Sequence, residues 1–165
     1  MFDKEYVFRG KHAMMVKKLA SKLSDEVGSG FFATNYDIYR LAPIIGWVYN
    51  RKADIDKGEE STKIFGDKML NEKDEMIFNY RVLMLLENSK KTDQERIDIA
   101  FKLDNDDEAR KEYDKLYNSY VLGGVEEMYE RIFADSDSID GYIMNLQEFI
   151  EDLQVRLYGA DAVDI

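Results

Sequence analysis

The sequence predicts an all-α protein, a compact multi-helix domain of about seven helices around two buried central helices. Three observations lead to this prediction. The chain of 165 residues holds a single proline, so little interrupts a helical pattern. Apolar residues recur with a period of about 3.6, and runs of β-branched residues are scarce. The apolar share of 45 % is typical of a globular domain with a substantial core.

We expect residues 1–158 to form one helical domain and residues 159–165 a flexible acidic tail. Residues 2–9 form a short lead-in, and residues 11–27 should form the first helix. One face of that segment carries Val16, Leu19, Ala20, Leu23 and Val27. The sequence Gly28-Ser29-Gly30 is expected to end the helix.

The segment 36–52 is expected to be the first of the two central helices. Apolar residues occupy most of its circumference, which indicates a buried helix. Pro43 predicts a kink or a restart, because its ring nitrogen cannot donate to the preceding turn. Ala42 and Gly46 lie one helical turn apart, and their small size should let a neighbouring helix approach closely.

Residues 53–60 are expected to form a loop, and Ser61 or Thr62 should cap a short helix near 63–70. A longer helix near 72–88 should be the second central helix, because most of its residues are apolar. Arg81 lies inside that run. We expect it to reach the surface or to pair with a carboxylate, because an unpaired buried charge is very unfavourable.

Later helices are predicted from polar start signals. Capping boxes, Thr34 with Asp37 and Thr92 with Glu95, mark two helix starts, and the acidic stretch 104–107 marks another.

Gly123-Gly124 falls inside a helical pattern. It predicts either a close contact between helices, which we favour, or backbone amides presented to an anion. The last helix should run from Ile139 to Leu157 and end at Gly159.

No set of residues suggests catalysis, so we expect a protein that is not an enzyme and has no cofactor and no metal. The absence of cysteine excludes thiolate chemistry. Residues 135–148 resemble a calcium-binding loop, but their carboxylates are one position away from those that bind the ion. The only histidine, His12, is expected at the surface or at a helix start. Carboxylate pairs are common among 34 acidic residues and show no convergence.

The net charge of −11 argues against a surface that binds nucleic acid as a whole. Basic residues nevertheless gather near the N-terminus. They form either a solvated helix face or a patch that contacts an acidic partner or a nucleic-acid backbone. Two more cations are expected in the last turn of the 36–52 helix. The candidate partner-binding residues are therefore Arg9, Lys11, Lys17, Lys18, Lys22, Arg51 and Lys52.

Two segments together carry a family resemblance: DIYRLAPIIGW at 37–47, which leads into Arg51-Lys52, and YVLGGVE at 120–126. They resemble the small helical proteins associated with bacterial DNA phosphorothioation (Dnd) systems. Those proteins have an alanine-rich helix that ends in a Gly-aromatic turn before basic residues, and a late aromatic-x-x-Gly-Gly helix. Pro43 and the acidic balance depart from that pattern. The resemblance implies an accessory role in an anti-phage or DNA-modification system and supplies no catalytic residues.

The function we expect is that of a non-enzymatic, cytoplasmic adaptor that binds another protein, a larger subunit of the same system. Two alternatives stay open. One is a nucleic-acid-contacting module that uses the basic N-terminal helix. The other is an acidic inhibitor that mimics DNA. No apolar run approaches the length of about 20 residues that spans a bilayer, so we expect no membrane contact. The oligomeric state is left open.

Overall fold

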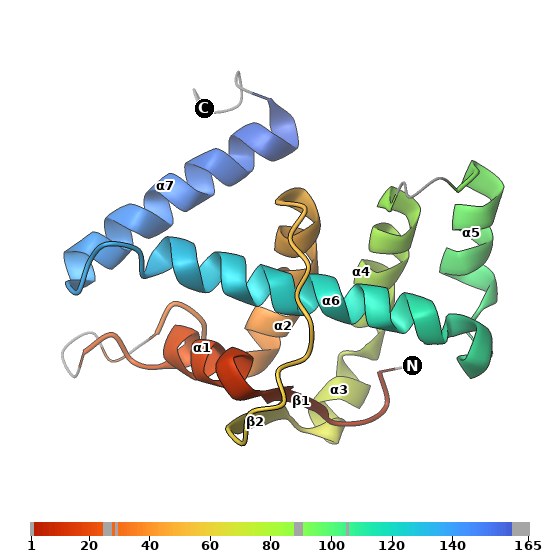
Figure 1. Ribbon diagram of the computed structural model, residues 1–165, viewed down its shortest axis with the longest axis horizontal. Helices are drawn as coiled ribbons and strands as arrows, with labels where there is room; N and C mark the ends of the chain where they lie inside the picture. The colour runs from red at the N-terminus through yellow and green to blue at the C-terminus, as the bar shows by residue number, and fades with distance from the viewer. Residues whose placement is uncertain (1, 25–27, 29, 88–90, 105, 160–165) are drawn as a thin grey trace.

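The computed structural model describes residues 2–24, 28, 30–87, 91–104 and 106–159. Within these ranges the chain has seven α-helices and a small two-stranded sheet, so the predicted fold class is confirmed (Figure 1). The helices are α1 (Gly10–Ala20), α2 (Asn35–Val48), α3 (Gly66–Asn71), α4 (Lys73–Leu86), α5 (Asp93–Lys102), α6 (Asp107–Ile132) and α7 (Ile139–Tyr158). The strands are β1 (Tyr6–Arg9) and β2 (Ser61–Ile64). Of the predicted acidic tail, all but Gly159 lies outside the described residues.

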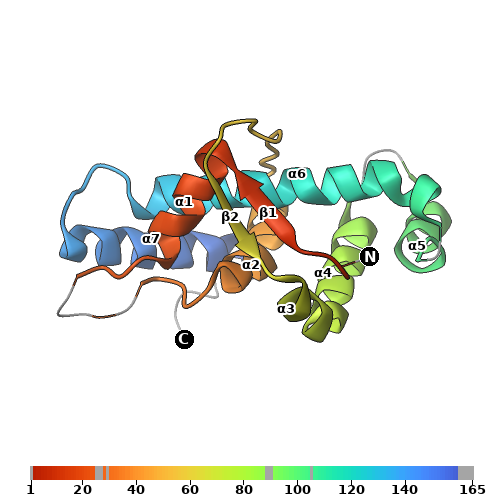
Figure 2. The same cartoon turned by 90° about the horizontal axis from the view of Figure 1, so that it is seen from below.

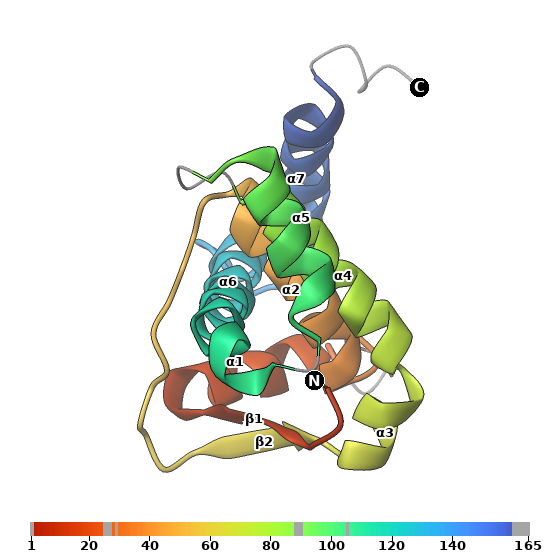
Figure 3. The same ribbon diagram turned by 90° about the vertical axis from the view of Figure 1, so that its right-hand side faces the viewer.

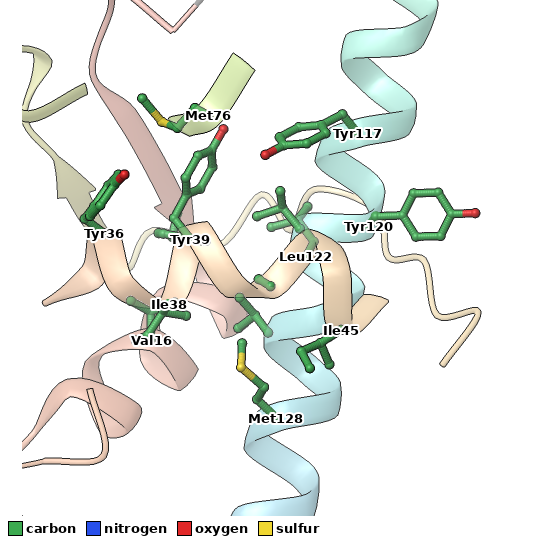
Figure 4. Close-up of a cluster of buried hydrophobic side chains, with 14 of the residues drawn as sticks. Val16, Tyr36, Ile38, Tyr39, Ile45, Met76, Tyr117, Tyr120, Leu122 and Met128 are labelled. Carbon is green, nitrogen blue, oxygen red and sulfur yellow. The ribbon is translucent and has the colours of Figure 1, made fainter. Parts of the chain in front are cut away.

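The crossing of α2 and α6 forms the centre of the molecule (Figures 1 and 4). Three glycines lie where the two backbones meet, and a methyl group on any of them would overlap a backbone carbonyl oxygen. Gly46 faces the carbonyl of Tyr120, Gly124 that of Ala42, and Gly123 that of Arg51. The predicted packing role of Gly46 and of Gly123-Gly124 is therefore confirmed.

Side chains from both helices fill the angle between them, among them Ile38 and Ile45 of α2 and Met128 of α6 (Figure 4). The second central helix is thus α6, and the prediction that it would be the 72–88 helix is wrong. That segment forms α4, which packs against α5 and one part of α2, and it leaves Phe78 and Leu86 exposed. In the sequence, the apolar run of α4 is a stronger sign of burial than the pattern of α6, because the buried positions of α6 include glycine, tyrosine and glutamate.

The two strands correct the prediction of a lead-in over residues 2–9 and of a helix cap at Ser61 or Thr62. The short helix predicted near 63–70 does form, as α3, but it begins at Gly66. β1 pairs antiparallel with β2, with Tyr6 opposite Ile64 and Arg9 opposite Ser61. Phe8 and Ile64 turn inward and are buried. The sheet lies at the lower edge of the molecule in Figure 3, beneath α1. An alternation over four residues is too short to be recognised as a strand in the sequence. Each strand is stabilised by pairing with a partner more than fifty residues away, which the local sequence does not show.

The first helix is shorter than predicted, because α1 ends at Ala20 and not near Val27. The amide and the hydroxyl of Ser21 both donate to the carbonyl oxygen of Lys18, which closes the last turn. The chain then turns back, and the amide of Phe32 donates to the carbonyl oxygen of Leu19. Val27 lies outside the described residues.

Helix α2 runs without a restart through Pro43, but it ends at Val48, so Arg51 and Lys52 follow the helix instead of forming its last turn. Asn50 takes a left-handed conformation with φ of 50°. Its amide donates to the carbonyl of Trp47, and that of Arg51 donates to Gly46. This is the hydrogen-bond pattern of a Schellman motif, in which asparagine can replace the usual glycine.

The remaining start signals hold. Thr34 with Asp37 and Thr92 with Glu95 form complete capping boxes. Asp106 caps α6, and Ser138 caps an unbroken α7 that ends at Gly159, as predicted. Arg81 donates to the carboxylate of Asp104 at 2.6 Å, so it has the partner that the sequence required.

Substituting Gly124 tests the contact between α2 and α6. We expect Gly124→Ala to lower the free energy of unfolding by about 3 kcal/mol, because neither backbone can yield without disturbing the other helix. Gly66→Ala is the matched control, since its methyl group would find only ordinary contacts. It should change stability by less than about 0.5 kcal/mol in urea unfolding. Equal effects of the two variants would contradict a tight crossing.

Two buried tyrosines offer a second test. The hydroxyl of Tyr80 has no hydrogen-bond partner among the described residues, whereas that of Tyr36 donates to Glu75 at 3.0 Å. Tyr80→Phe should leave stability unchanged or raise it by up to about 1 kcal/mol, because an unsatisfied group is removed. Tyr36→Phe should lower it by about 1 kcal/mol. Thermal and urea unfolding of both variants would measure the difference, and a larger loss for Tyr80→Phe would refute it.

Candidate partner-binding surface

Two of the predicted partner-binding cations, Lys11 and Arg51, meet at one carboxylate, that of Glu126 on α6. The Nζ of Lys11 lies 2.7 Å from Oε1, and the Nη2 of Arg51 lies 3.1 Å from Oε2. Glu126 itself is buried, with an exposed fraction of 7 %. Burial acts to raise its pKa, but hydrogen bonds from Lys11, Arg51 and His12 outweigh burial and lower it. The site is therefore a compensated ion cluster.

His12 belongs to the same cluster. Of the two places expected for it, the helix start is confirmed, because His12 lies in the first turn of α1, and the surface is wrong. Its ring is buried with 1 % exposure, and its Nε2 lies 3.0 Å from Oε1 of Glu126. Burial lowers the pKa of His12, and the hydrogen bond to Glu126 only partly offsets this. A neutral imidazole that donates from Nε2 fits both facts. One isolated histidine beside Lys11 gave no sequence signal of a buried partner 114 positions away.

Arg51 is held by three carboxylates on two adjacent turns of α6. Its Nη1 lies 2.6 Å from Glu130 and 3.0 Å from Glu127, and Nη2 donates to Glu130 and Glu126. The hydrogen bonds to Glu130 and the others raise the pKa of Arg51 still further. A guanidinium that already has several charged acceptors has little capacity left for a partner.

Hydrogen bonds on either side of this cluster attach the loop that follows α2 to α6 and to α1. The amide of Ala53 donates to the carbonyl of Ser119 on α6 at 3.0 Å. Asp56 accepts from the amide of Lys11 at the start of α1, and Gly58 donates to the other oxygen of Asp56. Figure 3 shows this segment running past α6 to reach β2. The cluster therefore joins α1, α6 and the loop, and its role is structural.

The other predicted cations do not form a continuous patch. Lys17 pairs with Glu60, and Lys18 lies 5.3 Å from the ring centre of Phe133. Lys52 lies over the ring of Tyr120 at 4.6 Å and 3.9 Å from a carboxylate oxygen of Glu87. Arg9 and Lys22 are exposed. Within the described ranges these two alone of the seven candidates have neither an ion pair nor a ring contact.

A different surface was missed by reasoning from charge: the face of α2 that points away from α6. It carries Leu41, Ile44, Trp47 and Val48, which are spaced by about one helical turn. The sequence showed a helix that is apolar almost all round, from which we inferred full burial. The structure covers one side with α6 and leaves this other side half-buried or exposed.

Two hollows lie along this face of α2, and we call them together the α2 groove. The first, of about 500 Å³, is lined by Leu41, Ile44 and residues of the loop before α2. The second, of about 520 Å³, is lined by Trp47, Val48, Leu86 and Leu157. In Figure 1, α2 passes behind α6 with α7 on one side and α4 on the other.

The charged side chains that line the α2 groove are balanced in number, two carboxylates and two arginines. Four charged residues line it, namely Asp37, Arg40, Glu87 and Arg156. Both arginines are already paired, Arg40 with Glu75 at 3.2 Å and Arg156 with Asp152 at 2.9 Å. A basic partner would therefore be attracted by the net charge of −11, and it would not have to displace an unpaired arginine from the groove.

The described part of the chain contains no group of three or more histidine, aspartate or glutamate side chains placed to hold a metal ion. None of the helices seen there has the length and apolar character required to cross a membrane.

The cluster around His12 generates a pH prediction. Because the pKa of His12 is lowered in the folded state, its proton binds more readily to the unfolded chain below pH 6.5. Stability should therefore be full above that pH and fall as the pH drops, by at most about 1.4 kcal/mol per pH unit for one proton. Urea unfolding between pH 7.5 and 5.5 should show the slope in the parent chain and lose it in His12→Gln. Ordinary carboxylates titrate below this pH range and should contribute little to the slope. A slope that His12→Gln retains would show that a group other than His12 causes the pH dependence.

Comparisons with known proteins give no relative from which a function could be transferred. The chain matches no protein-family model. It also matches no curated protein and no solved structure. Its function is therefore inferred from its own surface.

Proposed function

We propose that this chain is a non-enzymatic adaptor that binds an amphipathic helix of another protein in the α2 groove. One observation carries the proposal: a central helix of the fold exposes an apolar face. Leu41 is 36 % exposed there, and Leu157 on the neighbouring α7 is 44 % exposed. Scattered exposed apolar residues are common, but a row of them along one helix is typical of a docking surface.

The geometry favours a helical partner over a flat one. A helix lying along α2 could place apolar residues into the two hollows, in the way that helix-in-groove complexes use residues one turn apart. The net charge of −11 on the whole chain favours lysine or arginine on the flanks of that helix. The partner is thus expected to be amphipathic and basic.

The resemblance to Dnd-associated proteins would place the partner in a DNA phosphorothioation system, and this stays a prediction, as does the cytoplasmic location. The alternative of a nucleic-acid module receives less support. Of the five N-terminal cations that it would use, Lys11 and Lys17 pair with carboxylates of the chain itself. No observation favours the DNA-mimicking alternative.

Trp47, the only tryptophan, lines the α2 groove and reports on it directly. We expect a synthetic amphipathic peptide with leucine on one face and lysine on the other to shift Trp47 emission to shorter wavelength. The same peptide with glutamate in place of lysine should bind more weakly, and a scrambled one should not bind. Leu41→Glu and Leu157→Glu should weaken binding about tenfold or more, because each buries a charge against the peptide.

Met14→Glu is the matched control, because Met14 is an exposed apolar residue on α1 that lines neither hollow of the α2 groove. It should bind like the parent chain. The same variants, co-expressed with the products of neighbouring genes, then identify the natural partner. Unchanged binding by both groove variants, or duplex DNA binding that weakens steeply with salt and requires Arg9 and Lys22, would overturn the adaptor proposal.

A further inference from the structure

A separate cavity lies on the opposite side of α2 from the α2 groove. It encloses about 320 Å³ between the N-terminal segment, α2, α3 and α6. Figure 2 shows the chain entering β1 alongside α3 and α4. A volume of this size far exceeds the space of about 30 Å³ that one water molecule occupies. It lies at the lower end of the range found for small-molecule sites, about 300–1,000 Å³.

Four aromatic rings from three parts of the chain line the cavity in succession. The ring centres of Phe2 and Tyr117 are 5.7 Å apart, those of Tyr117 and Tyr39 6.5 Å, and those of Tyr39 and Tyr6 4.5 Å. In Figure 4, Tyr39 of α2 and Tyr117 of α6 point toward each other. These two are almost fully buried, whereas Phe2 and Tyr6 are half-buried. Aromatic rings that surround one space attract a positive charge.

Carboxylates predominate over cations at the same cavity. Asp3, Glu5 and Asp114 line it, against a single lysine, Lys4. Glu5 also pairs with Lys63 at 3.0 Å. Asp114 accepts two hydrogen bonds from Arg110 at 3.2 Å each.

The pairing with Arg110 does not fully compensate Asp114. Burial raises the pKa of this carboxyl, and the neighbouring guanidinium only partly opposes the rise. A further positive group in the cavity would stabilise the ionised form.

The rings and the carboxylates together select one class of ligand. A bare metal ion would require several converging oxygen ligands. A neutral aromatic molecule would gain nothing from the carboxylates. We propose that this cavity binds an alkylated ammonium group, either in a small quaternary amine or at the end of a methylated lysine side chain. Aromatic walls with a nearby carboxylate suit a cation that is large, weakly hydrated and unable to donate many hydrogen bonds.

The test uses the intact chain and three probes: choline, N-acetyl-trimethyllysine amide and 3,3-dimethyl-1-butanol, the neutral isostere of choline. Met69 lines the cavity, so its methyl resonance reports occupancy, while exposed Met144 on α7 serves as an internal reference. We expect one or both cations to shift the Met69 signal with millimolar or tighter affinity and to leave Met144 unchanged. The isostere should bind about tenfold more weakly, because it lacks the charge. The tighter of the two cations identifies the source of the group.

Two variants make the result specific. Asp114→Asn keeps the shape but removes the charge, and Arg110 stays paired with Asp107 at 2.5 Å. It should weaken choline binding about fivefold, as should Phe2→Ala, which removes one ring. Glu148→Gln removes one negative charge from the surface of α7 and should have no effect. Urea unfolding establishes that each variant is folded. Equal affinity for the isostere, no Met69 shift, or unchanged binding by both cavity variants would overturn the proposal.

Discussion

The backbone contact between α2 and α6 is the constraint on which the rest of the structure depends. Gly46 and Gly124 remove side chains at the crossing, and Gly123 does the same for the chain that leaves α2, because it faces the carbonyl of Arg51. The two helices and the loop after α2 therefore meet without a layer of side chains between them. No other element pair in the described ranges packs so extensively. Helices α1, α4 and α7 then take positions on the sides that remain.

That contact also decides where the charges go. By holding Arg51 against α6, it places the guanidinium within reach of Glu126, Glu127 and Glu130. Lys11 and His12 of α1 close the same group from the other side. A buried ion cluster adds less to stability than its short distances suggest, because each charge loses its hydration. Its geometry does fix the relative positions of three elements, and it withdraws cations from the surface of an acidic chain.

Local features of the fold could be predicted from the sequence, and non-local ones could not. The caps at Thr34 and Thr92, the end of α7 at Gly159 and the packing role of Gly123-Gly124 each depend on residues within a few positions of one another. The strand pairing and the burial of His12 depend on partners more than fifty positions away. Periodicity alone also ranked α4 above α6, because tyrosine and glycine mark a helix crossing less clearly than aliphatic residues do. The outer face of α2 was wrongly expected to be buried within the fold. An apolar face indicates that something covers it, but the sequence does not say whether the cover is this chain or a partner.

Helix α2 therefore has two sides with different surroundings. The side toward α6 is locked by backbone contact, and Tyr39, near its start, extends from it into the aromatic cavity. Two residues later, Leu41 lies on the open side. A helix clamped in this way cannot shift its backbone to accommodate a ligand, so the side chains it presents are preorganised. Preorganisation reduces the ordering that binding would otherwise require, which favours recognition of a partner by a small surface. The glycines that hold the fold together thus also supply the rigidity that a docking surface on α2 would need.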